Sequence, residues 1–147
     1  IFLNKTHFST EFFAQHSKNP FRSFLQRDVI GFGTRISLDD STKLGLGVLK
    51  EDEEDLQGIE TDTERLSLYF TDKYELAENI DLLITAYYQP SLDETDDYKA
   101  SILTGVNFTI NENVSISLQF SSFYDSIPPE FADKQDEQIS TEFSYSF

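Results

Sequence analysis

The most restrictive feature of this sequence is a two-residue alternation of apolar and polar side chains that persists over long segments. In residues 139–147, Phe143, Tyr145 and Phe147 fall on one face, and serines and a glutamate fall on the other. Residues 97–110 and 113–124 repeat the pattern. A helix would spread these apolar residues around its whole axis, whereas successive side chains of a strand point to opposite faces. We therefore expect the chain to fold from β-strands.

Eight strands account for the alternation. We predict them at residues 4–16, 22–38, 42–51, 63–72, 79–89, 97–110, 113–124 and 138–147. Several exceed the roughly five or six residues typical of globular strands and reach the roughly 9–11 that cross a bilayer. No apolar run approaches the roughly 18 residues of a transmembrane helix. The sequence predicts an all-β fold, an antiparallel transmembrane β-barrel that forms one domain over residues 1–147.

The predicted connections alternate in length. Those at 39–42, 72–79 and 111–113 are short or moderate, and those at 17–21, 51–62, 90–97 and 125–137 are longer or more polar. All four prolines lie in the longer set, where the missing N–H does not interrupt a ladder. Short turns on one side and long loops on the other are typical of bacterial outer-membrane barrels.

The two faces of the predicted strands differ in chemistry. One is almost entirely aliphatic or aromatic, and we assign it to lipid. The other is small, polar or charged and is predicted to face a lumen. The charged residues on this second face are Glu11, Arg27, Arg35, Lys43, Arg65, Asp81, Lys99 and Glu142. Five of the six glycines share it: Gly31, Gly33, Gly45, Gly47 and Gly105. They would leave room for long side chains in a narrow lumen.

Charge excludes one class of function. The chain has 27 acidic and 11 basic residues and a net charge of −16, so it lacks the basic footprint of a nucleic-acid-binding protein. Most of the acids crowd three of these connections and their flanks, within residues 51–64, 93–97 and 125–137. We interpret these as solvated external loops. Carboxylates are also ligands for divalent cations, and the sequence leaves that possibility open.

The sequence offers little for catalysis. There is no cysteine, which excludes disulfides, cysteine-ligated zinc and thiol chemistry. The histidines are His7 and His16, and Ser9 shares a face with His7, but no G-x-S-x-G nucleophile elbow occurs. We predict no catalytic, cofactor-binding or metal-binding residues, no cofactor and no enzymatic activity.

Several short segments together resemble one known family. Residues 87–92 read YYQPSL, residues 96–98 read DDY, and residues 124–129 read YDSIPP. Residues 12–15 read FFAQ and precede Arg27, Gly31, Gly33 and Arg35, and residues 143–147 read FSYSF. In this order and spacing they are similar to domain-of-unknown-function family 481, also described as salt-induced outer-membrane proteins. The resemblance spans nearly the whole chain.

The resemblance implies a location and a fold, since the family has no established activity. It implies a bacterial outer-membrane barrel. The chain opens with no positively charged start and no apolar h-region, so we expect that any signal peptide has already been removed. Members of the family are usually longer, so the chain resembles a C-terminal portion of the barrel. Its eight strands could close alone, or they could belong to a barrel of about twelve.

The last strand carries a further expectation. Phe143, Tyr145 and Phe147 fit the terminal aromatic pattern read by the barrel-assembly machinery, which would recognise them by strand addition. We therefore expect an outer-membrane component in contact with lipid and lipopolysaccharide, either structural or a subunit of a larger complex. A narrow pore for small solutes or ions is an alternative. A soluble barrel that binds a small apolar ligand is another, because alternation alone does not say which face points outward.

Overall fold

The fold was obtained as a computed structural model that describes residues 7–19, 24–130 and 132–146. All regular structure in these residues is β-strand, and the eight predicted strands are confirmed. They are β1 (His7–Asn19), β2 (Phe24–Ser37), β3 (Lys43–Asp55), β4 (Glu60–Ala77), β5 (Ile80–Pro90), β6 (Tyr98–Asn111), β7 (Val114–Asp125) and β8 (Gln135–Tyr145). The described residues contain no helix that is long and apolar enough to cross a membrane.

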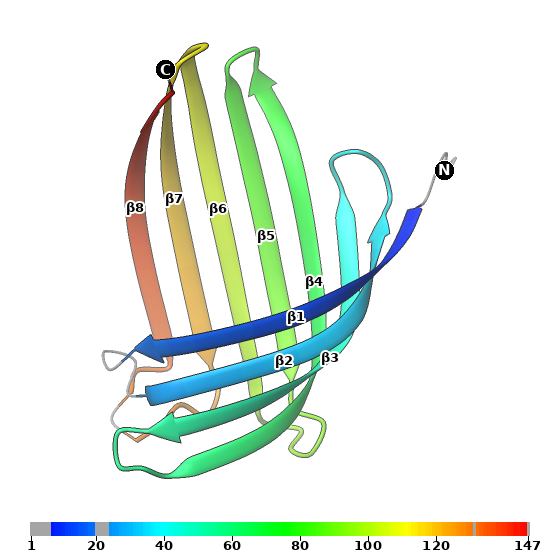
Figure 1. The fold of residues 1–147 in the computed structure, drawn as a ribbon, viewed down its shortest axis with the longest axis vertical. Coiled ribbons are helices and arrows are strands. Elements are labelled where there is room, and N and C mark those ends of the chain that lie inside the picture. The colour runs from blue at the N-terminus through cyan, green and yellow to red at the C-terminus, as the bar shows by residue number, and fades with distance from the viewer. Residues whose placement is uncertain (1–6, 20–23, 131, 147) are drawn as a thin grey trace.

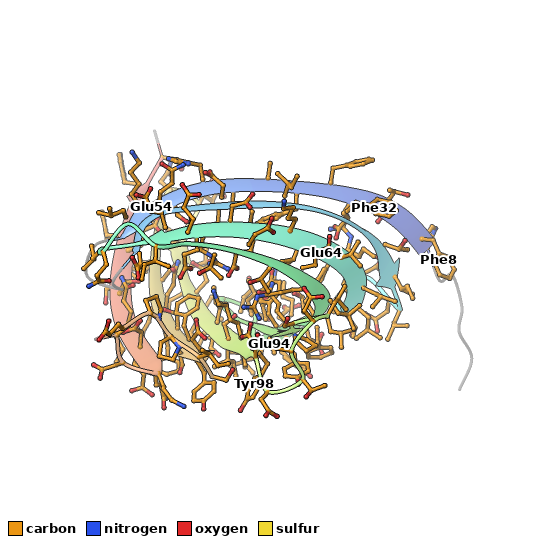
Figure 2. All side chains as sticks on the ribbon, turned by 90° about the horizontal axis from the view of Figure 1, so that it is seen from below. Phe8, Phe32, Glu54, Glu64, Glu94 and Tyr98 are labelled. Carbon is orange, nitrogen blue, oxygen red and sulfur yellow. The ribbon has the colours of Figure 1, made fainter. Side chains whose placement is uncertain are left out.

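The strands form one antiparallel sheet in chain order, in which each strand pairs with the next. Figure 1 shows β5–β8 upright and side by side, while β1–β3 slant across in front of them. Figure 2 looks along the upright strands and shows the sheet curled around a central space occupied by side chains. The sheet therefore has a concave and a convex face.

The sheet does not close on itself in the described residues. There, β1 pairs with β2 alone and β8 with β7 alone, so each has an unpaired edge. The predicted all-β antiparallel architecture is observed, and the predicted closure into a barrel is not.

Glycines on β2 and β3 permit the curl. Gly33 and Gly47 are cross-strand partners. A Cβ atom built on Gly33 would lie 2.7 Å from the carbonyl oxygen of Leu46, and one on Gly47 would lie 2.8 Å from that of Phe32. Since both obstacles are backbone atoms, neither could move aside easily. These glycines thus allow two backbones to approach on the inside of the bend.

The two faces of the sheet are inverted relative to a water-soluble protein. Four of the five most buried described side chains, Val29, Leu49, Glu51 and Arg65, lie on the concave face, and the fifth, Asp72, lies on the convex face. On the convex face Phe12 is 84% exposed and Ile139 is 72% exposed. Ionic groups are therefore buried, while large apolar groups face outward.

The predicted acidic connection at 51–62 is wrong. β3 continues to Asp55 and β4 begins at Glu60, which leaves residues 56–59 as the link. Gly58 has a positive φ of 80° there, which suits glycine. The alternation runs on through the acids: Glu51 and Glu53 point to the concave face, and Asp52 points outward. A strand can carry consecutive acids when alternate ones meet cations.

Two other boundaries also differ from the prediction. β4 extends to Ala77, so the predicted turn at 72–79 shrinks to Glu78 and Asn79. Pro90 is the last residue of β5 and not part of a loop, while Pro20 lies outside the described residues. The links at 38–42, 78–79 and 112–113 form one end of the sheet, the turn end. Those at 56–59, 91–97 and 126–134 form the other, the loop end.

Candidate functional site

The strongest chemical feature is a buried carboxylate, Glu51, surrounded by cations on the concave face near the loop end. Its side chain is 3% exposed. Arg27 donates from both Nε, at 2.9 Å, and Nη2 to Oε2, and Lys99 donates from Nζ to Oε1. Arg65 Nε lies 3.7 Å from Oε1. One carboxylate is therefore shared by three basic side chains.

Further acids complete the cluster. Lys99 Nζ lies 3.4 Å from Glu53 Oε2 and 3.5 Å from Asp125 Oδ2. Arg65 forms a two-pronged ion pair with Asp97, at 3.0 and 2.8 Å. We call the seven residues the Glu51 network: Arg27, Glu51, Glu53, Arg65, Asp97, Lys99 and Asp125. Its three positive and four negative charges nearly balance, as buried charge requires.

The network fastens a loop to the sheet. Asp97 belongs to the link between β5 and β6, and Arg65 holds it while also donating from Nη1 to the carbonyl oxygen of Gln89 at 3.3 Å. The amide of Leu92 donates to the carbonyl oxygen of Glu64 at 2.8 Å. Arg65 Nε itself is buried without a hydrogen-bond partner. The loop is thus folded back over β4.

The network also crosses the concave space. Lys99 lies on β6 and Glu51 on β3, and the sheet places β4 and β5 between them. A hydrogen bond between these side chains can form only because the sheet curls. It is a side-chain bridge between strands that are not neighbours.

Electrostatics keep Glu51 ionised. Its convex-face neighbours at this level, Asp28, Lys50 and Asp52, are charged and exposed, so Glu51 lies beyond the apolar part of the sheet. Burial by itself raises the pKa of Glu51. The charges and hydrogen bonds of Lys99 and Arg27 outweigh that effect and lower its pKa to about 2.

A second polar cluster lies toward the turn end. Arg35 Nη1 is 2.9 Å from Glu11 Oε1, and the Tyr69 hydroxyl donates to Glu11 Oε2 at 2.7 Å. The ring of Tyr69 covers Gly45, where a Cβ atom would lie 1.9 Å from the ring carbon Cε1. Here a glycine does make room for a long side chain, as the sequence suggested. The Tyr69–Glu11 bond is another bridge between strands that are not neighbours.

These groups line a hollow of about 650 Å³ on the concave face. We call it the trough. Its polar lining includes Glu11, Arg35, Lys43, Ser67, Tyr69 and Gln89. No described carboxylate forms an ion pair with Lys43, so the trough carries an excess of positive charge.

The register places all eight charged residues predicted for the lumen on one face of the sheet. Arg27, Arg65 and Lys99 converge in the Glu51 network. Glu11, Arg35 and Lys43 line the trough. The other two lie toward the turn end: Asp81 pairs with Lys73 at 3.1 Å, and Glu142 accepts from Ser144 at 3.3 Å.

Sequence reasoning missed the acids of the network. From the sequence alone, Glu51, Glu53, Asp97 and Asp125 fall in predicted solvated loops. Glu51 and Glu53 could have been found by extending the two-residue alternation. They continue the odd-numbered series of Gly45, Gly47 and Leu49, which all lie on the polar face. The other two sit at strand ends, where alternation gives no orientation.

The remaining candidates stay separate from this site. His16 pairs with Asp28 at 2.6 Å in an exposed position on the other face. Among the residues that the structure describes, no three histidine, aspartate or glutamate side chains are grouped so as to hold a metal ion. Phe143 and Tyr145 are exposed on β8, and Phe147 lies outside the described residues.

Comparison with known proteins agrees with the resemblance seen in the sequence. Residues 1–147 match the family described as protein of unknown function, DUF481. The chain belongs to DUF481. No curated protein and no solved structure matches it. What a DUF481 protein of this kind does must therefore be argued from its own side chains.

Proposed function

We propose that this DUF481 chain forms the wall of a β-barrel in the outer membrane of a Gram-negative bacterium, as a non-enzymatic component of the envelope. It would serve as a structural element or as a subunit of a larger outer-membrane complex. The observation that carries the proposal is the apolar convex face. Large apolar residues stand exposed along it on every strand from β1 to β8, while the most buried charged residues, Glu51 and Arg65, lie on the opposite face.

The large exposed fractions of these apolar side chains support contact of the convex face with lipid. Phe8 is 71% exposed, and Phe143 is 65% exposed at the far edge of the sheet. Exposed apolar surface costs about 25 cal/mol per Å² in water, and extended patches of it mark membrane or protein contact. The soluble barrel with an apolar interior requires the opposite arrangement.

The height of the apolar surface also fits a bilayer. Tyr88, Tyr98 and Tyr124 form a row on the convex face near the loop end, with ring centroids 5.7 and 5.6 Å apart. Phe108 lies ten residues after Tyr98 on β6. At about 3.4 Å per residue and a tilt of about 40°, that separation spans about 26 Å. Outer-membrane barrels carry an apolar band of about 25 Å between aromatic girdles.

In this setting both edges of the sheet need partners. Hydrocarbon offers no hydrogen bonds to the free N–H and C=O groups of β1 and β8, so a membrane sheet must be closed. We therefore propose that the sheet is part of a closed barrel. In the described residues β8, the strand of Phe143 and Tyr145, pairs along its backbone with β7 alone, which suits strand addition by the barrel-assembly machinery.

The proposal can be tested by cysteine substitution, because the chain has no cysteine of its own. Leu46→Cys and Asp52→Cys lie on the same face of β3, the first in the apolar part and the second beyond it. In outer-membrane fractions, a membrane-impermeant maleimide should label Asp52→Cys and spare Leu46→Cys until detergent is added. An unheated sample should also migrate differently from a heated one on a gel.

Equal labelling of both cysteines without detergent would contradict the proposal, as would recovery of a monomer that needs no detergent. Phe8→Cys on β1 and Phe143→Cys on β8 extend the same comparison to the two edges. Protection there would show that lipid or a partner strand covers both.

A further inference from the structure

We propose that the interior of this chain is a gated path for small anionic solutes, closed at the loop end by the Glu51 network. The inference rests on the proposed function and goes beyond it, because a purely structural barrel needs no path. Two observations carry it. The first is the trough, and the second is the position of Lys99 between two alternative sets of acids.

The trough supplies the path. Its hollow of about 650 Å³ is lined by polar and charged groups such as Arg35, Lys43 and Tyr69 and also by apolar side chains such as Phe13 and Leu49. Glu11 neutralises Arg35, and Lys43 remains without an ion-pair partner among the described residues. Within the trough, this excess of positive charge favours anions over cations.

The Glu51 network supplies the closure. It lies on the same face as the trough, displaced toward the loop end, so a solute entering from that end meets it first. Arg65 is 3% exposed and Lys99 is 16% exposed, so both side chains are enclosed by their neighbours. The Lys99–Glu51 hydrogen bond crosses the curled sheet at this level.

Lys99 has a second acidic partner within reach, Asp125. Asp125 is its register partner on the adjacent strand β7, and its Oδ2 atom is 3.5 Å from Lys99 Nζ. If the ammonium moves fully onto Asp125, it keeps an ion pair while it leaves Glu51 and Glu53 on β3. Glu51 also keeps a partner, because Arg27 still binds it from β2. The bridge can therefore open without leaving either charge unpaired.

The test is conductance of the full chain in planar lipid bilayers, in potassium chloride. Glu51→Gln and Lys99→Gln both break the bridge, and each should raise conductance severalfold over the wild type. Their selectivity should differ, since the first adds a net positive charge to the interior and the second removes one. Reversal potentials in a salt gradient should show stronger chloride preference for Glu51→Gln.

Two variants act as controls. Glu54→Gln removes a carboxylate from the same strand on the convex face, so it should conduct like the wild type. Asp125→Asn removes the open-state partner of Lys99, so it should conduct no more than the wild type. Heat-dependent gel migration of each variant shows that it has folded.

The outcomes separate the two proposals. If the wild type enters bilayers with heat-dependent migration, but neither Glu51→Gln nor Lys99→Gln conducts more than it does, the gate is wrong and the barrel stands. Potassium preference in Glu51→Gln would likewise overturn the anion path. If the wild type never inserts, both proposals fail.

Discussion

The two halves of the sheet, β1–β4 and β5–β8, differ in how deeply they bury side chains. Every described side chain that is almost fully buried lies on β2, β3 or β4: Val29, Leu49, Glu51, Arg65 and Asp72. On β5–β8 the concave face carries small polar groups such as Ser101, Asn107 and Ser117, and none is buried to that degree. The first half is where the sheet bends and where the most buried charges lie, while the second, apart from Lys99 and Asp125 near its loop end, is an amphipathic wall.

The convex face follows the same division. On β3 the outward apolar run ends at Val48, and Lys50 and Asp52 follow. On β6 the outward residues from Tyr98 to Ile110 include no charge. The convex face of β6 is therefore uncharged along its whole length, whereas β3 has an apolar convex segment followed by a charged one.

The sharpest test of this division replaces one interior polar group in each half. Arg65→Leu removes a guanidinium that is 3% exposed and leaves Asp97 and Glu51 short of a partner. We expect it to lower the free energy of unfolding by about 3–5 kcal/mol. Asn107→Leu removes a 2.9 Å hydrogen bond from Ser117 and should cost about 1 kcal/mol. Urea unfolding from lipid vesicles measures the free energy of unfolding of both variants. Equal losses in the two variants would contradict a difference between the two halves of the sheet.

Acid should weaken the first half selectively. The pKa of Glu51 is held at about 2 against an ordinary 4.5, so its ionic contribution is complete above pH 4.5 and is lost as the pH falls toward 2. This contribution is about 3 kcal/mol at neutral pH. The stability gap between the wild type and Glu51→Gln should therefore narrow over that range. A gap independent of pH would mean that Glu51 contributes through packing and not through charge.

The smallest expected effect compares two glycines on the same face. Gly33→Ala forces a methyl group against the Leu46 carbonyl oxygen and should cost about 1–3 kcal/mol. At Gly105 the nearest atom to an added Cβ is Gln119 Cγ at 4.0 Å. Gly105→Ala should leave stability unchanged or raise it by about 0.5 kcal/mol. Thermal unfolding of the pair would show whether the bend depends on β2 and β3.

Much of the fold could be predicted because the two-residue period is a local property. Strand number and the side of the strand on which Glu11, Arg35 and Lys99 lie follow from it, and the short connections between consecutive strands predict antiparallel order. The limits of β3 and β4 could not be predicted, since a run of acids such as Glu51–Asp55 resembles a loop unless its cationic partners are known. Those partners, Arg27 on β2 and Lys99 on β6, meet Glu51 only through the curl.

The curvature of the sheet could not be predicted directly from the sequence. The glycines of β2 and β3 indicated free space, and the structure shows two different uses of it. Gly45 accommodates the Tyr69 ring, whereas Gly33 and Gly47 allow close backbone approach. Closure of the sheet depends on how far it bends and on what pairs with β1 and β8, and neither is encoded in the alternation of any single strand.

The side-chain bridges across the concave space have a consequence for the order of folding. All backbone pairing joins strands that follow one another in the chain, so each hairpin can form from local contacts. The Lys99–Glu51 and Tyr69–Glu11 bonds instead join residues 48 and 58 positions apart. They can form only after several hairpins have associated and curved, while their charges remain hydrated. Substitutions in the bridges should therefore accelerate unfolding and leave the rate of hairpin assembly nearly unchanged.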